Sequence, residues 1–279
     1  MASSQTLEVS GYQVVQFIGS GAGSTLWQIR DRRTEEVYAL KRVLKRTAED
    51  MKFLDQAINE YEIGSKLTHP ALRRMIEMRR VKHWLSLREI QLVMEFCPGQ
   101  TLQENRIENV PQVVTIFNEV ASGLAYMNAH GFVHSDIKPN NIVVSPEGVV
   151  KVIDMGQSCA LGTIKERIQG TPDFIAPEQV HRRPLDARTD VYNFGATLYW
   201  VLIGKAIPTS LPQKGSMTMM ADLSIIPPED LNNEVPTSLN KLVMDCIETR
   251  PQKRPSSMNE VASRLSLIGH TLKKNGQNG

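Results

Sequence analysis

The short segment Cys97-Pro98-Gly99-Gln100 divides this chain into two parts with different secondary-structure patterns. Proline and glycine together interrupt both helices and strands, so a hinge is expected there. Strand-like patterns dominate before the break, at residues 12–18, 25–31, 37–43, 72–81 and 90–96, with one helical pattern at 49–67. Helical spacing dominates after it, at residues 110–130, 190–203, 238–248 and 257–267. Strands followed by helices, rather than alternating with them, predict an α+β fold with two lobes.

The expected domain covers residues 12–268. We expect its first lobe, about 12–95, to be a five-stranded antiparallel sheet with one helix, and its second lobe, about 100–268, to be larger and mostly helical. The hinge between them covers about 95–99. Residues 269–279 are predicted to form a disordered tail, because its last seven residues, Lys-Lys-Asn-Gly-Gln-Asn-Gly, offer no apolar side chain for packing.

Composition excludes several classes of protein. The formal net charge of +2 is too small to attract nucleic acid or a membrane surface, and 41% apolar with 22% charged residues is typical of a soluble globular chain. Three scattered cysteines predict neither a disulfide framework nor a zinc site. The longest apolar run, at 191–204, is too short to span a bilayer, and the N-terminus lacks a secretory signal. A cytoplasmic location is the simplest interpretation.

The loop His134-Ser135-Asp136-Ile137-Lys138-Pro139-Asn140-Asn141 carries three polar groups at suggestive spacing. Its aspartate can act as a base, its lysine can clamp a phosphate and Asn141 can bind a metal. Asp154, which follows a predicted strand, can supply a second metal ligand. Together these groups are what the transfer of a phosphoryl group from a nucleotide to a hydroxyl requires.

A glycine-rich run, Ile18-Gly19-Ser20-Gly21-Ala22-Gly23-Ser24-Thr25-Leu26, lies between two predicted strands. Glycines let backbone N–H groups approach phosphate oxygens, although a plain hairpin turn has the same composition. The strand that follows argues against dinucleotide-binding and P-loop sites, which need a helix there. Downstream, Lys41 lies on a strand, and Glu60 or its neighbour Glu62 can pair with it. All three are ordinary surface charges under the simplest alternative.

These motifs resemble those of the protein kinase family, and their order along residues 12–267 is the order of the family. The resemblance is completed by further segments in the second half of the chain: Asp154-Met155-Gly156, Gly170-Thr171-Pro172, Ala176-Pro177-Glu178, Asp190-Val191-Tyr192-Asn193-Phe194-Gly195 and Arg254-Pro255. It implies a bilobal kinase fold and ATP-dependent phosphorylation of a protein substrate. It also implies that Glu178, Arg254 and Asp190 have structural roles.

The resemblance implies a role for each site residue. Asp136 is similar to the catalytic base and Lys138 to the residue that steadies the transferred group, whereas Asn141 and Asp154 resemble the ligands of Mg²⁺. Lys41, positioned by Glu60, would contact the phosphates of ATP. The remaining nucleotide contacts are expected from the glycine-rich loop (Ile18, Gly19, Ser20, Gly21, Ala22, Gly23 and Ser24), from the adenine-contacting side chains (Leu26, Ala39 and Val143), and from the backbone of Glu95 and Cys97.

The chain resembles Ser/Thr kinases rather than tyrosine kinases. Lys138 and Pro139 after the base carry this resemblance, and Thr171 is expected to hydrogen-bond Asp136 and Lys138. A kinase of small metabolites is the alternative, and the segment at 170–178 disfavours it. A substrate protein bearing serine or threonine is therefore the expected partner.

Besides Met155, which stands where the family has phenylalanine after the metal-binding aspartate, three residues depart from the family pattern: Ser24 in the glycine-rich loop, Gly64 in the first helix and Ser135 before the base. Many family members have an arginine at position 135, which binds a phosphorylated activation loop. We therefore predict that phosphorylation at Ser158, Thr163 or Thr171 is not the main on-switch. We also expect Gly64 to weaken the docking of its helix. The alternative that these departures support is a pseudokinase scaffold that binds nucleotide or partners without turnover.

Residues 73–88 include six basic side chains against one acidic one, with Glu89 next to them. A docking surface for an acidic partner is one interpretation and a nucleic-acid surface is another, although the near-neutral chain argues against nucleic acid. Solvated strand faces explain the same pattern without any partner. The sequence leaves open whether the chain is a whole protein or the catalytic part of a longer one.

Overall fold

The computed structural model describes residues 8–21, 23–208 and 225–277, which form two compact units. The sheet unit comprises Met1–Thr68 and Arg73–Cys97, and the helical unit comprises His69–Leu72 and Pro98–Gly279. The chain changes units after Cys97, within the expected hinge. The short segment His69–Leu72 belongs to the helical unit because the N–H of Val152 donates to the carbonyl of Ala71 at 2.7 Å and Leu72 bridges to Val152.

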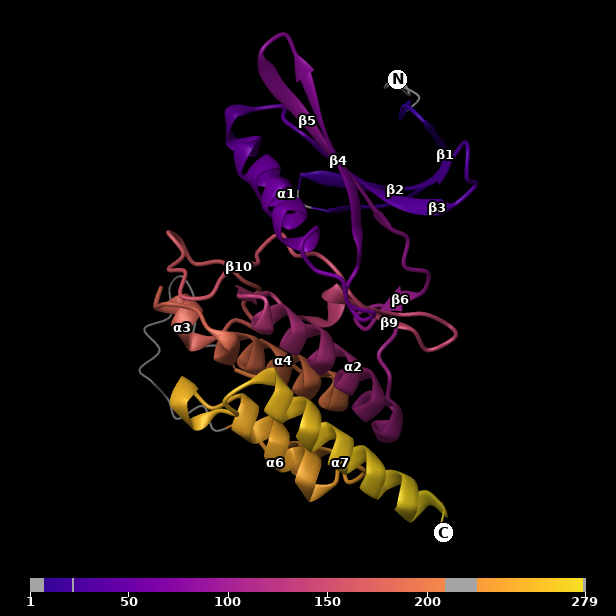
Figure 1. Cartoon of the computed structure of the whole chain (residues 1–279). Helices are drawn as coiled ribbons and strands as arrows, with labels where there is room; N and C mark the ends of the chain where they lie inside the picture. The colour runs from indigo at the N-terminus through magenta and orange to yellow at the C-terminus, as the bar shows by residue number, and fades with distance from the viewer. Residues whose placement is uncertain (1–7, 22, 209–224, 278–279) are drawn as a thin grey trace. The chain divides into compact units, whose positions relative to one another are not determined.

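The sheet unit confirms the predicted five antiparallel strands and single long helix. Its strands follow the order β1-β2-β3-β5-β4, and α1 packs against β3, β4 and β5 (Figure 1). The elements are β1 (Tyr12–Gly21), β2 (Ser24–Asp31), β3 (Val37–Leu44), a 3-10 turn (Ala48–Asp50), α1 (Met51–Gly64), β4 (Met75–His83) and β5 (Ser86–Glu95).

Apolar side chains are buried on both faces of this sheet. Successive side chains leave a strand on opposite faces, so Ala39 joins the core formed with Leu54 of α1, whereas Leu40 joins Val93 in the other core. This alternation orients Lys41 as well, because it must leave β3 on the same face as Ala39. The strand therefore directs Lys41 toward α1.

Helices dominate the other unit, where α2, α4, α6 and α7 pack against one another (Figure 1). The helices are α2 (Val110–Ala129), α3 (Pro177–Val180), α4 (Ala187–Ile203), α5 (Pro228–Leu231), α6 (Thr237–Cys246) and α7 (Met258–Gln277), with 3-10 turns at Pro139–Asn141 and Pro251–Lys253. The strands are β6 (Gln100–Thr101), β7 (Phe132–Val133), β8 (Ile142–Val144), β9 (Val150–Val152) and β10 (Cys159–Ala160). None of the helices in the described ranges combines the length and apolar character needed to cross a bilayer.

The buried helix α4 is built by local signals and one close contact. Asp186 caps its first turn by accepting the N–H of Arg188 at 2.8 Å, and Gly204 ends it with a left-handed φ of 76°. A Cβ at Gly195 would lie 2.5 Å from the Cβ of Cys246 in α6. Only glycine therefore allows the two helices to approach this closely.

Two sequence expectations are wrong at helix ends. The disordered tail predicted from residue 269 is instead a continuation of α7, which ends at Gln277. Packing explains the difference, because Ile268 is buried and position 269 faces Val114 of α2. Gly64 is the last residue of α1 rather than an interior one. The cost of glycine inside a helix therefore does not apply to it.

Candidate active site

The buried carboxylate of Asp190 in α4 accepts hydrogen bonds from the backbone of the loop that carries Asp136. Its Oδ2 accepts the N–H of His134 at 3.0 Å and the amide of Asn128 at 2.8 Å, and its Oδ1 accepts the N–H of Ser135 at 2.8 Å. Three donors satisfy a group that would otherwise be costly to bury. Asp190 therefore fixes the backbone directly before Asp136, as the sequence predicted for a structural anchor.

His134, the first residue of this loop, is neutral. Its side chain is fully buried, and burial lowers the pKa of its imidazole. Its Nδ1 accepts the N–H of Asp136 at 3.3 Å, which requires an unprotonated nitrogen. The negative charge of Asp136 is consequently not compensated by a histidine cation next to it.

Asp136, Lys138 and Thr171 form a closed triangle of hydrogen bonds. The ammonium of Lys138 donates to Oδ2 of Asp136 and to Oγ1 of Thr171, both at 2.9 Å. The hydroxyl of Thr171 donates to Oδ1 of Asp136 at 3.0 Å. The two contacts predicted for Thr171 are confirmed, and a carboxylate, a cation and a hydroxyl converge on one point.

The proposed metal ligands are joined by the backbone. The Nδ2 of Asn141 donates to the carbonyl of Asp136 at 2.8 Å, which leaves its side-chain oxygen as the acceptor. The N–H of Ile153 donates to the carbonyl of Asn141 at 2.8 Å and brings Asp154 next to it. No cluster of three or more His, Cys, Asp or Glu side chains suited to a metal occurs in the described ranges. An amide oxygen and a carboxylate fit Mg²⁺, which takes its other ligands from water and phosphates.

Lys41 and Glu60 form a short ion pair within the sheet unit. The Nζ of Lys41 lies 2.6 Å from Oε2 of Glu60, and the glutamate side chain is only 1% exposed. Glu62, the alternative partner in the sequence, is exposed on α1. The pairing of Lys41 with Glu60 is therefore confirmed, and the surface-charge alternative is wrong for both residues.

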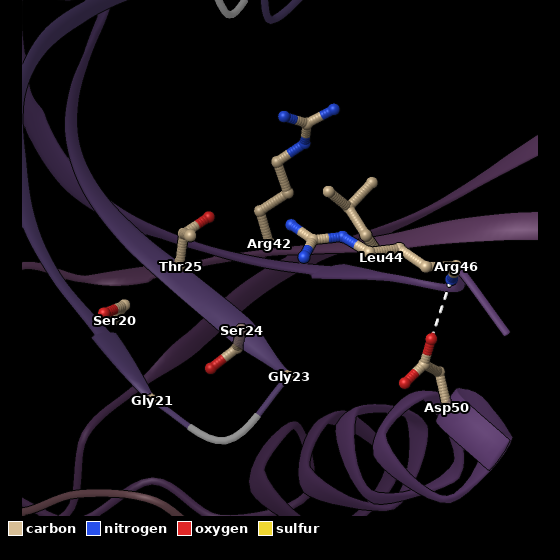
Figure 2. Close-up of a pocket in the computed structure, with 9 residues that line it drawn as sticks. All are labelled: Ser20, Gly21, Gly23, Ser24, Thr25, Arg42, Leu44, Arg46 and Asp50. Atoms are coloured by element: carbon tan, nitrogen blue, oxygen red, sulfur yellow. Dashed lines mark hydrogen bonds between the residues drawn. The ribbon is translucent and has the colours of Figure 1, made fainter. Parts of the chain in front are cut away.

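The glycine-rich run forms the hairpin between β1 and β2, where Gly21 pairs with Ser24; Ala22 lies outside the described residues. No helix follows directly, as the sequence indicated. Beside the hairpin, β3 and the segment that ends in the 3-10 turn before α1 complete a cavity of about 230 Å³, which Figure 2 shows with its lining residues. It is lined by Ser20, Gly21, Gly23, Ser24, Thr25, Arg42, Leu44, Arg46 and Asp50. Arg42 directly follows Lys41 and leaves β3 on the opposite face, so Lys41 does not point into this cavity.

The predicted adenine-contacting residues and their neighbours occupy both units. In the sheet unit, Ile18 is exposed, Leu26 is half-buried and Ala39 is buried. In the strand pairing, Leu26 lies opposite Lys41 and Ala39 opposite Met94. Gly19 and Ser20 of β1 pair with Leu26 and Thr25 of β2. Glu95 and Cys97 end this unit, and the thiol of Cys97 contacts the carbonyl of Glu95 at 3.7 Å. Val143 belongs to the helical unit, in β8 opposite Thr101.

The basic segment at 73–88 is divided by the structure. Arg73 is buried and donates to the sulfur of Met94, and Arg79 is held by both carboxylate oxygens of Glu77. Arg73 is therefore not available to a partner, and Arg79 is already paired. The remaining exposed cations are Arg74, Arg80, Lys82 and Arg88.

Sequence reasoning missed one polar residue beside the site. The side-chain amide of Gln179 is buried and joins the carbonyl of Ser135 to that of Gln169. Its position directly after Pro177 and Glu178 gave no sign of this contact, because its partners are backbone carbonyls.

Replacing Thr171 by valine should lower kcat about 10- to 100-fold, because each hydrogen bond to a charged group contributes about 1.5–3 kcal/mol. Valine keeps the shape of threonine but removes the hydroxyl shared by Asp136 and Lys138. Steady-state kinetics of Thr171→Val and Thr171→Ser measure the effect, with serine expected to retain most of the activity. Equal losses in the two variants would contradict a role for the hydroxyl.

The protein kinase domain model matches residues 12–265 of the chain. A probable serine/threonine-protein kinase of Clostridium acetobutylicum is 27% identical over 269 residues, which cover 92% of this chain and 40% of the relative. The serine/threonine-protein kinase PknL of Mycobacterium tuberculosis is 31% identical over 271 residues, or 94% of this chain and 67% of the relative. The serine/threonine-protein kinase PLK4 of Drosophila melanogaster is 27% identical over 84% of this chain. The chain spans about two fifths of the length of the first curated relatives it matches.

Proposed function

The chain belongs to the protein kinase family, and from this premise we propose that it transfers the γ-phosphoryl group of ATP to serine and threonine hydroxyls of protein substrates. The observation that carries the proposal is the triangle of Asp136, Lys138 and Thr171. It provides an acceptor for the proton of an attacking hydroxyl and a cation for the phosphoryl group. The similarity to proteins named as serine/threonine-protein kinases supports the Ser/Thr class.

In the proposed mechanism Asp136 orients the substrate hydroxyl and accepts its proton as the bond to phosphorus forms. Lys138 offers its ammonium to the oxygens of the transferred group. Thr171 keeps both side chains aligned through its hydroxyl. Asn141 and Asp154 would hold Mg²⁺, which neutralises charge on the phosphates when bound.

In the sheet unit, Lys41 would bind the α- and β-phosphates of ATP, and Glu60 would hold its ammonium in place. A lysine that must point at phosphate needs an acidic partner, and the ion pair at 2.6 Å meets that requirement. The glycine-rich hairpin at 18–24 would contact the phosphates through its backbone. Leu26, Ala39 and Val143 would contact adenine, with the backbone of Glu95 and Cys97 at its edge.

A transfer assay tests this proposal. The purified chain is incubated with labelled ATP, Mg²⁺ and a generic basic protein, beside the variant Lys41→Met and a sample with chelator. We expect phosphoserine and phosphothreonine in the substrate, little phosphotyrosine, and no transfer in either control. Nucleotide binding without transfer by the parent chain would favour the pseudokinase scaffold instead.

We further expect activity that does not depend on phosphorylation of the segment at 154–178. Ser158 is buried, the hydroxyl of Thr163 donates to the carbonyl of Ala160 at 2.7 Å, and Thr171 is part of the triangle. Chain freed of phosphate by a phosphatase, as verified by mass spectrometry, should phosphorylate its substrate at the rate of untreated chain. Loss of most activity, with none in a sample given inactivated phosphatase, would contradict this expectation.

Two expectations about partners and location remain part of the proposal. Arg80, Lys82 and Arg88 are exposed near the turn of the β4–β5 hairpin and are the residues we propose for docking an acidic protein. Cys97, Cys159 and Cys246 are not joined in disulfides, which supports a reducing compartment such as the cytoplasm.

A further inference from the structure

Ser135, the residue before the proposed base, has a strained backbone, and each of its polar groups is hydrogen-bonded. Its φ of 59° lies in the left-handed region, which non-glycine residues rarely adopt. Its N–H donates to Asp190, its hydroxyl donates to the carbonyl of Gln157 at 2.7 Å, and its carbonyl accepts the amide of Gln179 at 2.7 Å. A strained residue with all of its polar groups engaged indicates a position that the surroundings determine.

Lys165 donates to the same carbonyl of Gln157 that accepts the hydroxyl of Ser135. Its Nζ donates to the carbonyl of Gln157 at 2.7 Å, so the hydroxyl of Ser135 and this ammonium share one acceptor. The side chain is half-buried, and burial lowers the pKa of the ammonium. A lysine without a specific contact would extend its ammonium into water, where the charged form is favoured. Lys165 instead keeps its ammonium at the carbonyl of Gln157.

Gln179 fastens the other end of the same segment. Its Nε2 donates to the carbonyls of Ser135 and Gln169, at 2.7 and 3.2 Å. Its Oε1 accepts the N–H of Ala176 at 2.9 Å and the amide of Asn193 at 3.0 Å. All four hydrogen-bonding positions of this buried amide are filled, and three of them hold backbone, at Ser135 and at Gln169 and Ala176 on either side of Thr171.

We propose that Lys165 and Gln179 are positioning residues that hold the segment at 154–178 on Ser135 in its working arrangement, in place of a phosphate bound by an arginine. Lys165 fixes Gln157 and with it the turn at 155–158 that directly follows Asp154. Gln179 fixes the stretch from Gln169 to Ala176 that carries Thr171. The inference rests on the proposed function, since it specifies how the same site is kept ready.

The two residues have separable kinetic effects. Lys165→Met removes the charge-assisted hydrogen bond on the side of Asp154, so we expect kcat to fall about tenfold or more and the Mg²⁺ concentration for half-maximal rate to rise. Lys165→Arg retains a donor and should recover most of both. Gln179→Leu loosens the stretch that carries Thr171, so kcat should fall and KM for the protein substrate should rise, while the Mg²⁺ requirement stays near that of the parent chain.

Kinetics and hydrogen–deuterium exchange on the purified chain test this inference together. Lys241→Met, an exposed lysine of α6, is the matched control and should behave as the parent chain. In Lys165→Met, peptides covering 155–165 should exchange faster, and Lys165→Arg should restore their protection. Hydrogen exchange does not require activity, so it tests whether Lys165 holds the segment at Gln157 even in a chain that transfers no phosphate. A parent chain without phosphate transfer would overturn the proposed function alone.

Three results would overturn the inference. The first is parent-like kcat and Mg²⁺ dependence in Lys165→Met, which indicates at most a structural contact even if exchange is faster. The second is parent-like exchange of the peptides covering 155–165 in Lys165→Met. The third is an equal loss in Lys165→Arg and Lys165→Met. If Gln179→Leu fails to fold, the Lys165 variants still decide the question.

Discussion

Replacing Asp136 by asparagine is expected to lower kcat by about 10²–10⁴-fold, the usual contribution of a general base. Asparagine keeps the shape of the side chain and one oxygen acceptor. It removes the charge that faces Lys138 at 2.9 Å and the group that accepts the substrate proton. Nucleotide affinity should remain close to that of the parent chain, because the proposed phosphate contacts come from other residues.

Steady-state kinetics at saturating ATP measure the loss, and calorimetric titration with nucleotide measures the affinity. Asp186→Asn is a matched control, since Asp186 is half-exposed at the start of α4 and asparagine caps a helix as well as aspartate does. It should leave kcat unchanged. Asp136→Asn with the activity of the parent chain would exclude Asp136 as the base.

The pairs Lys41–Glu60 and Thr171–Asp136 could be predicted because each member has a distinctive side chain at a fixed place in an ordered set of motifs. The alternation of β3 then determines which face Lys41 takes, and the helical period of α1 brings Glu60 rather than Glu62 toward the sheet. The family resemblance, carried by the order of the motifs, was sufficient to predict these contacts, and the periodicity of the two elements agrees with it.

The contacts of Lys165 and Gln179 could not be predicted in the same way. Their partners are the carbonyls of Gln157, Ser135 and Gln169, and every residue has a carbonyl. Which carbonyls are free to accept depends on the path of the chain in three dimensions. The sequence does show Ser135 as unusual, but it does not show what replaces the missing arginine.

The end of α7 illustrates a second limit. Its last residues are polar and rich in glycine, which favours disorder when they are considered alone. Ile268, buried next to this stretch, packs the helix onto the unit, and a helix supported by tertiary contacts extends beyond what local propensity supports. Composition alone therefore placed the boundary too early.

The structure weakens the support that Ser24, Gly64 and Ser135 gave to the pseudokinase hypothesis, because two of the three have a structural explanation. Gly64 only ends its helix, and Ser135 is integrated by three hydrogen bonds rather than left as a gap. The residues proposed for transfer are all present: Asp136 is hydrogen-bonded to Lys138, Thr171 and Asn141, and Lys41 is paired with Glu60. The departures are therefore consistent with the altered means of control that we propose.

Replacing Arg254 by methionine should destabilise the helical unit by about 3–5 kcal/mol, because it leaves Glu178 buried without its partner. The guanidinium donates to both carboxylate oxygens of Glu178, at 2.7 and 2.9 Å, and to the carbonyls of Glu248, Arg188 and Thr249. The exposed fractions of the two side chains are 0% and 6%. For a unit of this size the melting temperature should fall by about 10 °C.

Thermal and urea unfolding measure this loss, and Arg30→Met is the control. Arg30 pairs with Glu35 at 3.4 Å, but these side chains are 44% and 69% exposed, so its loss should cost at most about 1 kcal/mol. The double variant Arg254→Met with Glu178→Leu should regain part of the stability, because it removes the uncompensated charge. If the single Arg254→Met variant is as stable as Arg30→Met, the buried pair does not brace the unit. If the double variant is no more stable than the single one, the cost comes from the carbonyls that Arg254 satisfies rather than from the charge of Glu178.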